Sequence, residues 1–187
     1  MAFWQSVKLE PKRSFRFTLS VAGTNDEGLQ EFLIEKVNKP GFSVSESEVK
    51  YLNHTFYYPG RVTWNDISFT IIDCLDPPVA NATVQVMKML QASGYSIPQG
   101  PAVAGALETL SKSSSLAALG MVKIHQYSAA GGAPQETWIL NNAWIKDVKF
   151  GDLDYGSEDM QKVEVTLKYD NAYVQTRGQG KFPAGPG

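Results

Sequence analysis

The sequence is poor in the residues that most often mark disulfide frameworks, metal centres and catalytic sites. It has one cysteine, Cys74, and two histidines, His54 and His125, in 187 residues. A single cysteine has no partner in the chain for a disulfide, which fits synthesis in the reducing cytoplasm. With so few thiol and imidazole groups, zinc sites and histidine-based triads have few possible ligands or bases.

An excess of one charge and long apolar runs are also missing. There are 17 Lys and Arg residues against 19 Asp and Glu residues, a formal net charge of -2. Affinity for nucleic acid comes largely from cations that neutralise phosphates, so a dedicated nucleic-acid binder would show a basic excess, and this sequence does not. No apolar run approaches the roughly 20 residues that span a bilayer, and the N-terminus lacks a signal-peptide pattern. We therefore expect no membrane partner.

The common motifs of phosphate binding and nucleophilic catalysis are absent: there is no Walker loop, no G-x-G-x-x-G and no G-x-S-x-G. His125 lies in an alternating segment, where a solvated or hydrogen-bonded histidine is expected, and Cys74 is expected to be a small buried apolar residue. The four acidic residues within 152–159 lack the spacing of a calcium-binding loop, which favours a hairpin turn. We therefore expect no catalytic residues, metal ligands or cofactor, and no enzyme.

What the sequence does contain is a set of segments in which apolar and polar residues alternate, as in strands with one buried face. The first two segments, 15–21 and 32–37, flank a polar turn cluster and are expected to form a β-hairpin. Residues 79–93 repeat with helical period and are expected to form a helix. The pattern predicts a mainly β, α+β fold: a small antiparallel β-barrel or sandwich with one flanking helix. The other expected strands are 64–72, 121–127, 136–150 and 161–173.

One domain is expected to account for most of the chain, because 187 residues suffice for one substantial core and are short for two. We expect an N-terminal arm at 1–13, a β-barrel domain at 14–174 and a flexible C-terminal tail at 175–187. Within the domain, residues 40–62 are expected to be a long loop. Residues 97–119 are expected to be an inserted short helix with a surface loop.

Aromatic residues gather in the expected long loop, and an arginine follows them. Loops seldom expose several aromatic side chains unless a surface covers them, and aromatic residues with arginine are enriched at interface centres. Packing of the loop onto its own domain is the alternative. The apolar N-terminal arm is the second candidate for contact with another subunit. The predicted contact residues are Phe3, Trp4, Tyr51, Phe56, Tyr57, Tyr58 and Arg61.

Several blocks of sequence stand in a recognisable order. They are Lys39–Phe42, Glu48–Tyr51 and Tyr58–Thr70 in the first half, and Val122–Tyr127, Glu136–Trp144, Val148–Tyr155 and Val163–Asp170 in the second. Together they resemble the tail tube proteins of contractile-tailed bacteriophages of the T-even type. The likeness covers residues 14–174 and rests on the order of the blocks, since no single block is diagnostic.

The resemblance implies hexameric rings that stack into the inner tube of a contractile tail, with tail sheath, baseplate and tail terminator proteins as partners. It implies a structural protein of the virion tail, assembled in the host cytoplasm, whose lumen passes DNA during genome ejection without specific binding. The same fold class includes the type VI secretion tube protein and baseplate proteins that initiate the tube. A tube-initiating baseplate protein and, from a different class, a β-barrel carrier of a small apolar ligand are the alternatives.

Overall fold

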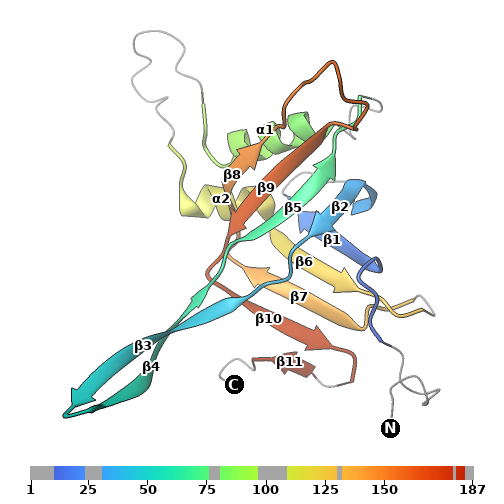
Figure 1. Ribbon diagram of the computed structural model, residues 1–187. Helices are drawn as coiled ribbons and strands as arrows, with labels where there is room; N and C mark the ends of the chain where they lie inside the picture. Colours follow the sequence, from blue (N-terminus) through green and yellow to red (C-terminus); the bar gives the residue numbers. More distant parts are fainter. Residues whose placement is uncertain are drawn as a thin grey trace, which may run out of the picture.

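The computed structural model describes residues 11–23, 31–75, 81–96, 109–129, 132–178 and 180–183. These residues form a mainly β structure with two α-helices, α1 (Ala82–Ala92) and α2 (Lys112–Leu119), and a short 3-10 helix, Glu31–Leu33 (Figure 1). The antiparallel strands make a five-stranded sheet in the order β1-β6-β7-β10-β11, a four-stranded sheet in the order β2-β5-β9-β8, and the pair β3-β4. The strands are β1 (Phe17–Ala22), β2 (Ile34–Val37), β3 (Phe42–Tyr51), β4 (His54–Trp64), β5 (Ile67–Ile72), β6 (Met121–Gln126), β7 (Glu136–Asn141), β8 (Trp144–Lys149), β9 (Lys162–Lys168), β10 (Asn171–Thr176) and β11 (Gly180–Phe182).

Two long paired segments of the chain cross from one large sheet to the other and tie the sheets together. β7 pairs with β10 in the five-stranded sheet, and their continuations β8 and β9 pair in the four-stranded sheet. The chain turns one corner at Asn142, whose φ is 56°, and the other at Asp170. The Asp170 N–H donates to the Asn141 carbonyl at 3.1 Å, and the Asp170 carboxylate accepts from Asn142 Nδ2 at 2.7 Å. These bonds hold the two corners side by side, so each of the expected strands 136–150 and 161–173 is divided between two sheets.

A single hydrophobic core lies between the two larger sheets and the helices. Leu19 and Ile124 enter it from the five-stranded sheet, and Phe69 and Leu167 from the four-stranded sheet, each at most 2% exposed. Full burial of a side chain of this size contributes about 1.5–3 kcal/mol. The alternating pattern is satisfied here because each large sheet covers the apolar face of the other.

The helices begin at conventional capping residues and close the core. The Asn81 side chain accepts a hydrogen bond from an N–H of α1 at 2.8 Å, and the Ser111 side chain accepts one from an N–H of α2 at 3.0 Å. Gly120, which ends α2, has a φ of 61°, and a Cβ there would lie 1.5 Å from the Ala22 carbonyl oxygen, so only glycine fits. Among the described residues, neither helix has the length and apolar character needed to cross a bilayer.

The third sheet projects from the body as a long twisted hairpin (Figure 1). β3 follows β2 and β4 precedes β5, and β2 and β5 are themselves paired, so the hairpin extends their ladder. Two backbone hydrogen bonds join the ladders: Asn38 N–H to the Ser68 carbonyl at 3.0 Å, and Asn65 N–H to the Gly41 carbonyl at 2.9 Å. We call residues 42–64 the hairpin arm.

The mainly β, α+β class is confirmed, although the described strands form sheets around a shared core rather than one closed barrel, and two helices accompany them. The helix expected within 79–93 is present as α1. The expected long loop at 40–62 is wrong, because the backbone groups of β3 and β4 pair with each other. The expected hairpin of 15–21 with 32–37 is also wrong, since β1 pairs with β6 and β2 with β5.

Two further expectations need correction. The segment 97–119 was expected to be a short helix with a surface loop; its described part contains the helix α2, but this helix buries Ala118 and Leu119 in the core instead of lying on the surface. The tail at 175–187 was expected to be flexible, but β11 pairs with β10 within it. Pairing with β10 thus orders residues of β11 that composition alone assigns to a flexible tail.

Candidate assembly surfaces

The hairpin arm is exposed on both faces, although much of it is apolar. Every residue of β3 is exposed, and so is every residue of β4 except Trp64. Tyr51 is 68% exposed and Leu52, at the tip, is 86% exposed. A two-stranded hairpin alone is marginally stable in water, and a concentration of exposed apolar side chains marks a surface that a partner covers. The other large exposed apolar residues of the arm are Phe42, Val44, Val49, Phe56, Tyr57, Tyr58 and Val62.

The register of β3 with β4 divides the outer half of the arm into two unlike faces. Opposed residues of an antiparallel pair share a face, and successive residues alternate between faces. Val49 opposes Phe56, Ser47 opposes Tyr58 and Tyr51 opposes His54. These residues form what we call the aromatic face of the arm. The opposite face carries Glu46, Glu48, Lys50, Thr55, Tyr57 and Pro59.

Of the five contact residues predicted in this segment, three are therefore brought together on the aromatic face, namely Tyr51, Phe56 and Tyr58. Tyr57 lies on the opposite face, across from Glu48. Arg61 lies apart from both groups, in an irregularity nearer the body. Phe3 and Trp4 lie outside the described residues.

A bulge in β4 separates the outer half of the arm from its root. Gly60 and Arg61 together oppose the single residue Ser45. The Arg61 N–H donates to Ser45 Oγ at 2.8 Å. A Cβ at Gly60 would lie 2.3 Å from Ser45 Oγ and 2.9 Å from the Ser45 carbonyl oxygen, so the approach of the two strands requires glycine. Past the bulge, the exposed apolar residues shift from one face of β3 to the other.

The root of the arm is fixed to the body by ring packing. Trp64 packs against Phe42 with ring centroids 5.5 Å apart, and against the buried Tyr169 at 6.0 Å. Ring pairs at these separations contribute about 0.5–1.5 kcal/mol beyond the burial of their area. The exposed arm therefore leaves the body in a defined direction.

An ion-pair group lies beside this ring packing. Asp66, just after β4, contacts Lys146 Nζ at 2.5 Å and Lys168 Nζ at 2.7 Å. The hydrogen bonds from Lys146 and Lys168 hold the pKa of Asp66 below its usual value. Lys168 is the last residue of β9, and Lys146 lies in β8. Asp66 therefore links the base of the arm to two strands, β8 and β9, of the four-stranded sheet.

A second exposed apolar segment was missed by sequence reasoning. It is the connection between β8 and β9, where Leu153 is 90% exposed and Tyr155 and Met160 are also exposed. The acidic residues of this segment predicted a turn, and its apolar residues were not among the predicted contact residues. The missed signal was the presence of large apolar residues between those acidic residues.

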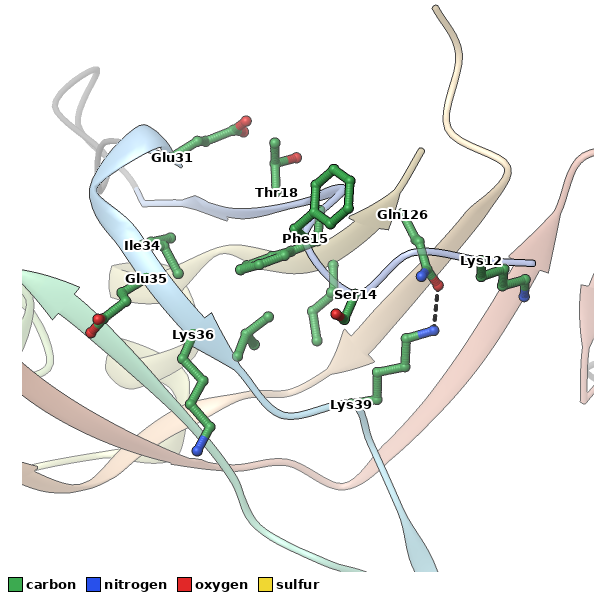
Figure 2. Close-up of a pocket in the computed structure, with 13 residues that line it drawn as sticks. Lys12, Ser14, Phe15, Thr18, Glu31, Ile34, Glu35, Lys36, Lys39 and Gln126 are labelled. Carbon is green, nitrogen blue, oxygen red and sulfur yellow. Dashed lines mark hydrogen bonds between the residues drawn. The ribbon is translucent and has the colours of Figure 1, made fainter. Parts of the chain in front are cut away.

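A groove lies between β1 and β2, the strands at one edge of each large sheet (Figure 2). Its volume is about 850 Å³. Phe17, Ile34, Val37 and Ile124 give it an apolar lining. Charged side chains share the lining: Lys12, Lys36, Lys39, Glu31 and Glu35.

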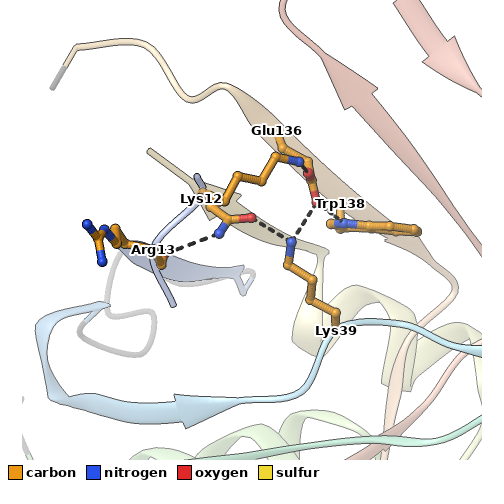
Figure 3. A network of polar contacts seen from close by, with 6 residues as sticks. Lys12, Arg13, Lys39, Glu136 and Trp138 are labelled. Carbon is orange, nitrogen blue, oxygen red and sulfur yellow. Dashed lines mark hydrogen bonds and ion pairs between the residues drawn. The ribbon is translucent and has the colours of Figure 1, made fainter. Parts of the chain in front are cut away.

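At one end of this groove, Glu136 gathers two lysines and a tryptophan (Figure 3). Its carboxylate accepts hydrogen bonds from Lys12 Nζ, from Lys39 Nζ at 2.7 Å and from Trp138 Nε1 at 2.6 Å. Burial alone would raise the pKa of Glu136, but these hydrogen bonds lower it to about 2. Lys12 belongs to the N-terminal segment and Lys39 to the connection that enters the hairpin arm. The buried carboxylate of Glu136 thus binds both the N-terminal segment, through Lys12, and the connection into the hairpin arm, through Lys39.

The residues considered for catalysis or metal binding are dispersed. His125 Nδ1 lies 3.0 Å from Thr137 Oγ1, and burial lowers the pKa of His125. Cys74 is a free, half-buried thiol. Within the described ranges, no group of three His, Cys, Asp or Glu side chains is arranged to hold a metal ion.

Comparison with known proteins finds similarity in structure alone. No family model matches the sequence, and no curated protein matches it. The tube-terminating cap of the anti-feeding prophage superposes with a TM-score of 0.63 at 17% identity, over 92% of this chain and 95% of that chain. The anti-feeding prophage baseplate, solved with 6-fold symmetry, gives 0.62 at 15% identity, over 88% and 95%. The sheath-tube complex of the extracellular contractile injection system PVC, in its extended state, gives 0.60 at 17% identity, over 95% and 99%.

At these identities the similarity shows the fold. It extends over most of this chain and nearly all of each compared chain. The tail-tube-like fold expected from the order of the sequence blocks is therefore confirmed, and this chain has the fold found in the tube, cap and baseplate structures of contractile injection systems.

Proposed function

We propose that the protein is a structural subunit of the inner tube of a contractile tail, and that rings of six copies stack into this tube. The solved structures of similar fold come from the tube, cap and baseplate of such assemblies, one of them 6-fold symmetric. In a phage tail the channel of this tube conducts the genome at ejection. A formal net charge of -2 suits a conduit that releases DNA rather than holding it.

The observation that carries the proposal is the hairpin arm. It projects from the body, exposes Tyr51, Phe56 and Tyr58 on one face, and is anchored at its root by Trp64. A monomer gains nothing from a rigidly anchored apolar arm in solvent, whereas a ring that inserts such arms into the next ring buries them. We propose that the aromatic face contacts the adjacent ring and that Arg61 contributes from the bulge.

The edges of the sheets provide for closure of the ring. In the described residues, β2 and β8 are the edges of the four-stranded sheet, and β1 and β11 those of the five-stranded sheet. Unpaired strand edges invite pairing with other chains, and a closed ring of subunits removes them. Stacking such rings head to tail then gives a filament that grows until another protein caps it.

The test compares the two faces of the arm at adjacent positions. Phe56→Ser and Tyr58→Ser each remove a ring from the aromatic face, and Tyr57→Ser removes the same kind of ring from the opposite face. We expect the first two to leave the circular dichroism spectrum unchanged and to shorten or abolish tubes in negative-stain micrographs. Tyr57→Ser should leave tube length within about twofold of the unsubstituted protein, since surface substitutions of this kind change stability by at most about 0.5 kcal/mol.

The oligomeric state of the unsubstituted protein decides between tube subunit and rivals. Long tubes at high concentration support the tube subunit, and single rings that do not stack support a cap or baseplate protein of the same fold. A monomer at all concentrations by light scattering, with an apolar ligand held in the protein, contradicts assembly and supports a carrier. Equal tube lengths in the Phe56→Ser and Tyr57→Ser variants remove the aromatic face from the proposal.

A further inference from the structure

The groove between β1 and β2 has the features of a site for an extended peptide segment. β1 and β2 are edge strands of different sheets, so, among the described residues, each has one row of backbone N–H and C=O groups without a strand partner. The floor is apolar through Phe17, Ile34 and Ile124. Extended segments bind such places by adding backbone hydrogen bonds along an edge and inserting alternate side chains into the apolar floor.

The chain has a segment of matching length and pattern that the described residues do not include. Residues 1–10 read Met-Ala-Phe-Trp-Gln-Ser-Val-Lys-Leu-Glu, in which Phe3, Val7 and Leu9 fall at alternate positions with Gln5 between them. Ten extended residues span at most about 33–36 Å. The groove is lined along β2 and its flanks, from Glu31 to Lys39.

The point at which this segment joins the body is fixed. Lys12 is held at the end of the groove by Glu136, and Gln126 Nε2 donates to the Arg13 carbonyl at 3.3 Å. Figure 2 shows the chain leading away from the groove as it reaches Lys12. To fill its own β1–β2 groove, the chain would have to reverse this direction before Lys12, whereas the groove of a neighbouring copy requires no reversal.

We propose that residues 1–10 of one copy lie as an extended strand in the β1–β2 groove of a neighbouring copy. Phe3, Val7 and Leu9 rest on the apolar floor, with Phe3 beside Lys36 and Lys8 meeting Glu31 on the charged rim. The occupant is thus a second copy of this chain. The inference rests on the proposed function, because assembly supplies the neighbour, and it assigns the N-terminal arm a docking site that the fold comparison does not specify.

Cross-linking between two separately prepared single-cysteine variants tests this proposal. In a Cys74→Ser background, Phe3→Cys is prepared with a purification tag and Lys36→Cys without one. The two are mixed at equal concentration, assembled and oxidised, and the products are resolved without reductant. Lys149→Cys, on an exposed position of β8 outside the groove, replaces Lys36→Cys in the matched control.

We expect a disulfide-linked dimer of tagged and untagged chains with Phe3→Cys and Lys36→Cys, at least tenfold more abundant than in the control. A dimer yield equal to the control overturns the proposal. A double variant carrying both Phe3→Cys and Lys36→Cys distinguishes the source of the segment: if it forms only an internal bridge within single chains, the arm fills its own groove and the proposal is overturned.

Electron microscopy of the same mixtures separates this inference from the proposed function. Tubes or rings without the selective cross-link leave the proposed function standing and remove the docking of the arm. Selective cross-linked dimers without rings or tubes support the docking and contradict the tube. Neither assembly nor cross-link contradicts both.

Discussion

Strands β9 and β3 both place valines between polar residues, and these valines have opposite environments. Val163 and Val165 of β9 are at most 1% exposed, whereas Val44 and Val49 of β3 are 48% and 50% exposed. The body has two sheets that cover each other, while the hairpin arm has one pair of strands and no cover among the described residues. The body therefore completes its own burial, and the proposed contact between copies would supply the burial of the arm.

This difference separates the parts of the molecule that determine stability from the parts that determine assembly. Substitutions in the body should act on the free energy of unfolding. Substitutions in the outer half of the arm should act on contacts between copies and leave the unfolding of the single chain nearly unchanged.

The largest expected difference between body and arm is in the loss of stability when a side chain is removed, and a core side chain of the body should show it most clearly. Leu167→Ala deletes a fully buried side chain from β9 and should lower the free energy of unfolding by about 3 kcal/mol. For a chain of this length this lowers the melting temperature by about 6–12 °C. Phe56→Ser, in the arm, should change it by less than about 2 °C. Thermal unfolding followed by circular dichroism measures both, and comparable shifts would mean that the arm belongs to the cooperative unit of the body.

A smaller effect is expected at Glu136, where the body meets the arm. The folded pKa of this carboxyl, about 2, lies below its ordinary value of 4.5. The unfolded chain therefore takes up the proton first on acidification, so the stability from Glu136 is complete above about pH 5 and is lost as the pH falls toward 2. Its size is on the order of 2 kcal/mol, allowing for the solvent that reaches Lys12 and Lys39. Glu136→Gln should remove this part of the pH dependence.

Urea unfolding at pH 7 and pH 2 measures this effect. The unsubstituted protein should lose about 2 kcal/mol more between the two pH values than the Glu136→Gln variant loses. Glu164→Gln is the matched control, because Glu164 forms an exposed pair with Lys149 at 3.6 Å, and such pairs contribute at most about 1 kcal/mol. Equal pH dependence in the Glu136→Gln variant and the unsubstituted protein would show that the carboxyl is not held as the structure places it.

The sequence predicted the body well and the arm poorly, for a physical reason. Alternation locates β5 and β9 because one face of each is buried, and the helical period locates α1. In β3 the apolar residues change from even positions, Phe42 and Val44, to odd positions, Val49 and Tyr51, so no single alternation covers the strand, and the aromatic segment was expected to be a loop. The pairing of β1 with β6 was also beyond the sequence, since it depends on contacts between segments about a hundred residues apart. The aromatic contact residues were identified, but their division between two faces depends on the register of β3 with β4, which the bulge at Gly60 interrupts toward the body.

A substitution at the bulge tests whether the arm can be destabilised without affecting the body. Gly60→Ala places a Cβ 2.3 Å from Ser45 Oγ, and overpacking of this kind costs about 1–3 kcal/mol. The cost should fall on the arm alone, as faster amide exchange across residues 43–63 with an unchanged melting temperature of the body. Gly41→Ala, where the nearest atom would be Asn65 Nδ2 at 3.5 Å, should leave exchange in the arm unchanged. Faster exchange throughout the body in the Gly60→Ala variant would contradict the independence of the two regions.

The smallest expected effect is at the tip, where arm and body use different residues for the same backbone conformation. Asn142 in the body has a φ of 56°, and Leu52 at the tip has a φ of 51°. Asparagine adopts this left-handed region more readily than leucine does, for which it costs about 1–2 kcal/mol. Leu52→Asn should therefore slow amide exchange at the tip of the free subunit by about fivefold, equivalent to about 1 kcal/mol. If Leu52 is instead held for its contact with the adjacent ring, the same variant should form shorter tubes, because an 86% exposed leucine loses its apolar contact. Slower exchange with tubes of full length would restrict the contact to the aromatic face, since the tip then contributes to the arm's own backbone and not to stacking.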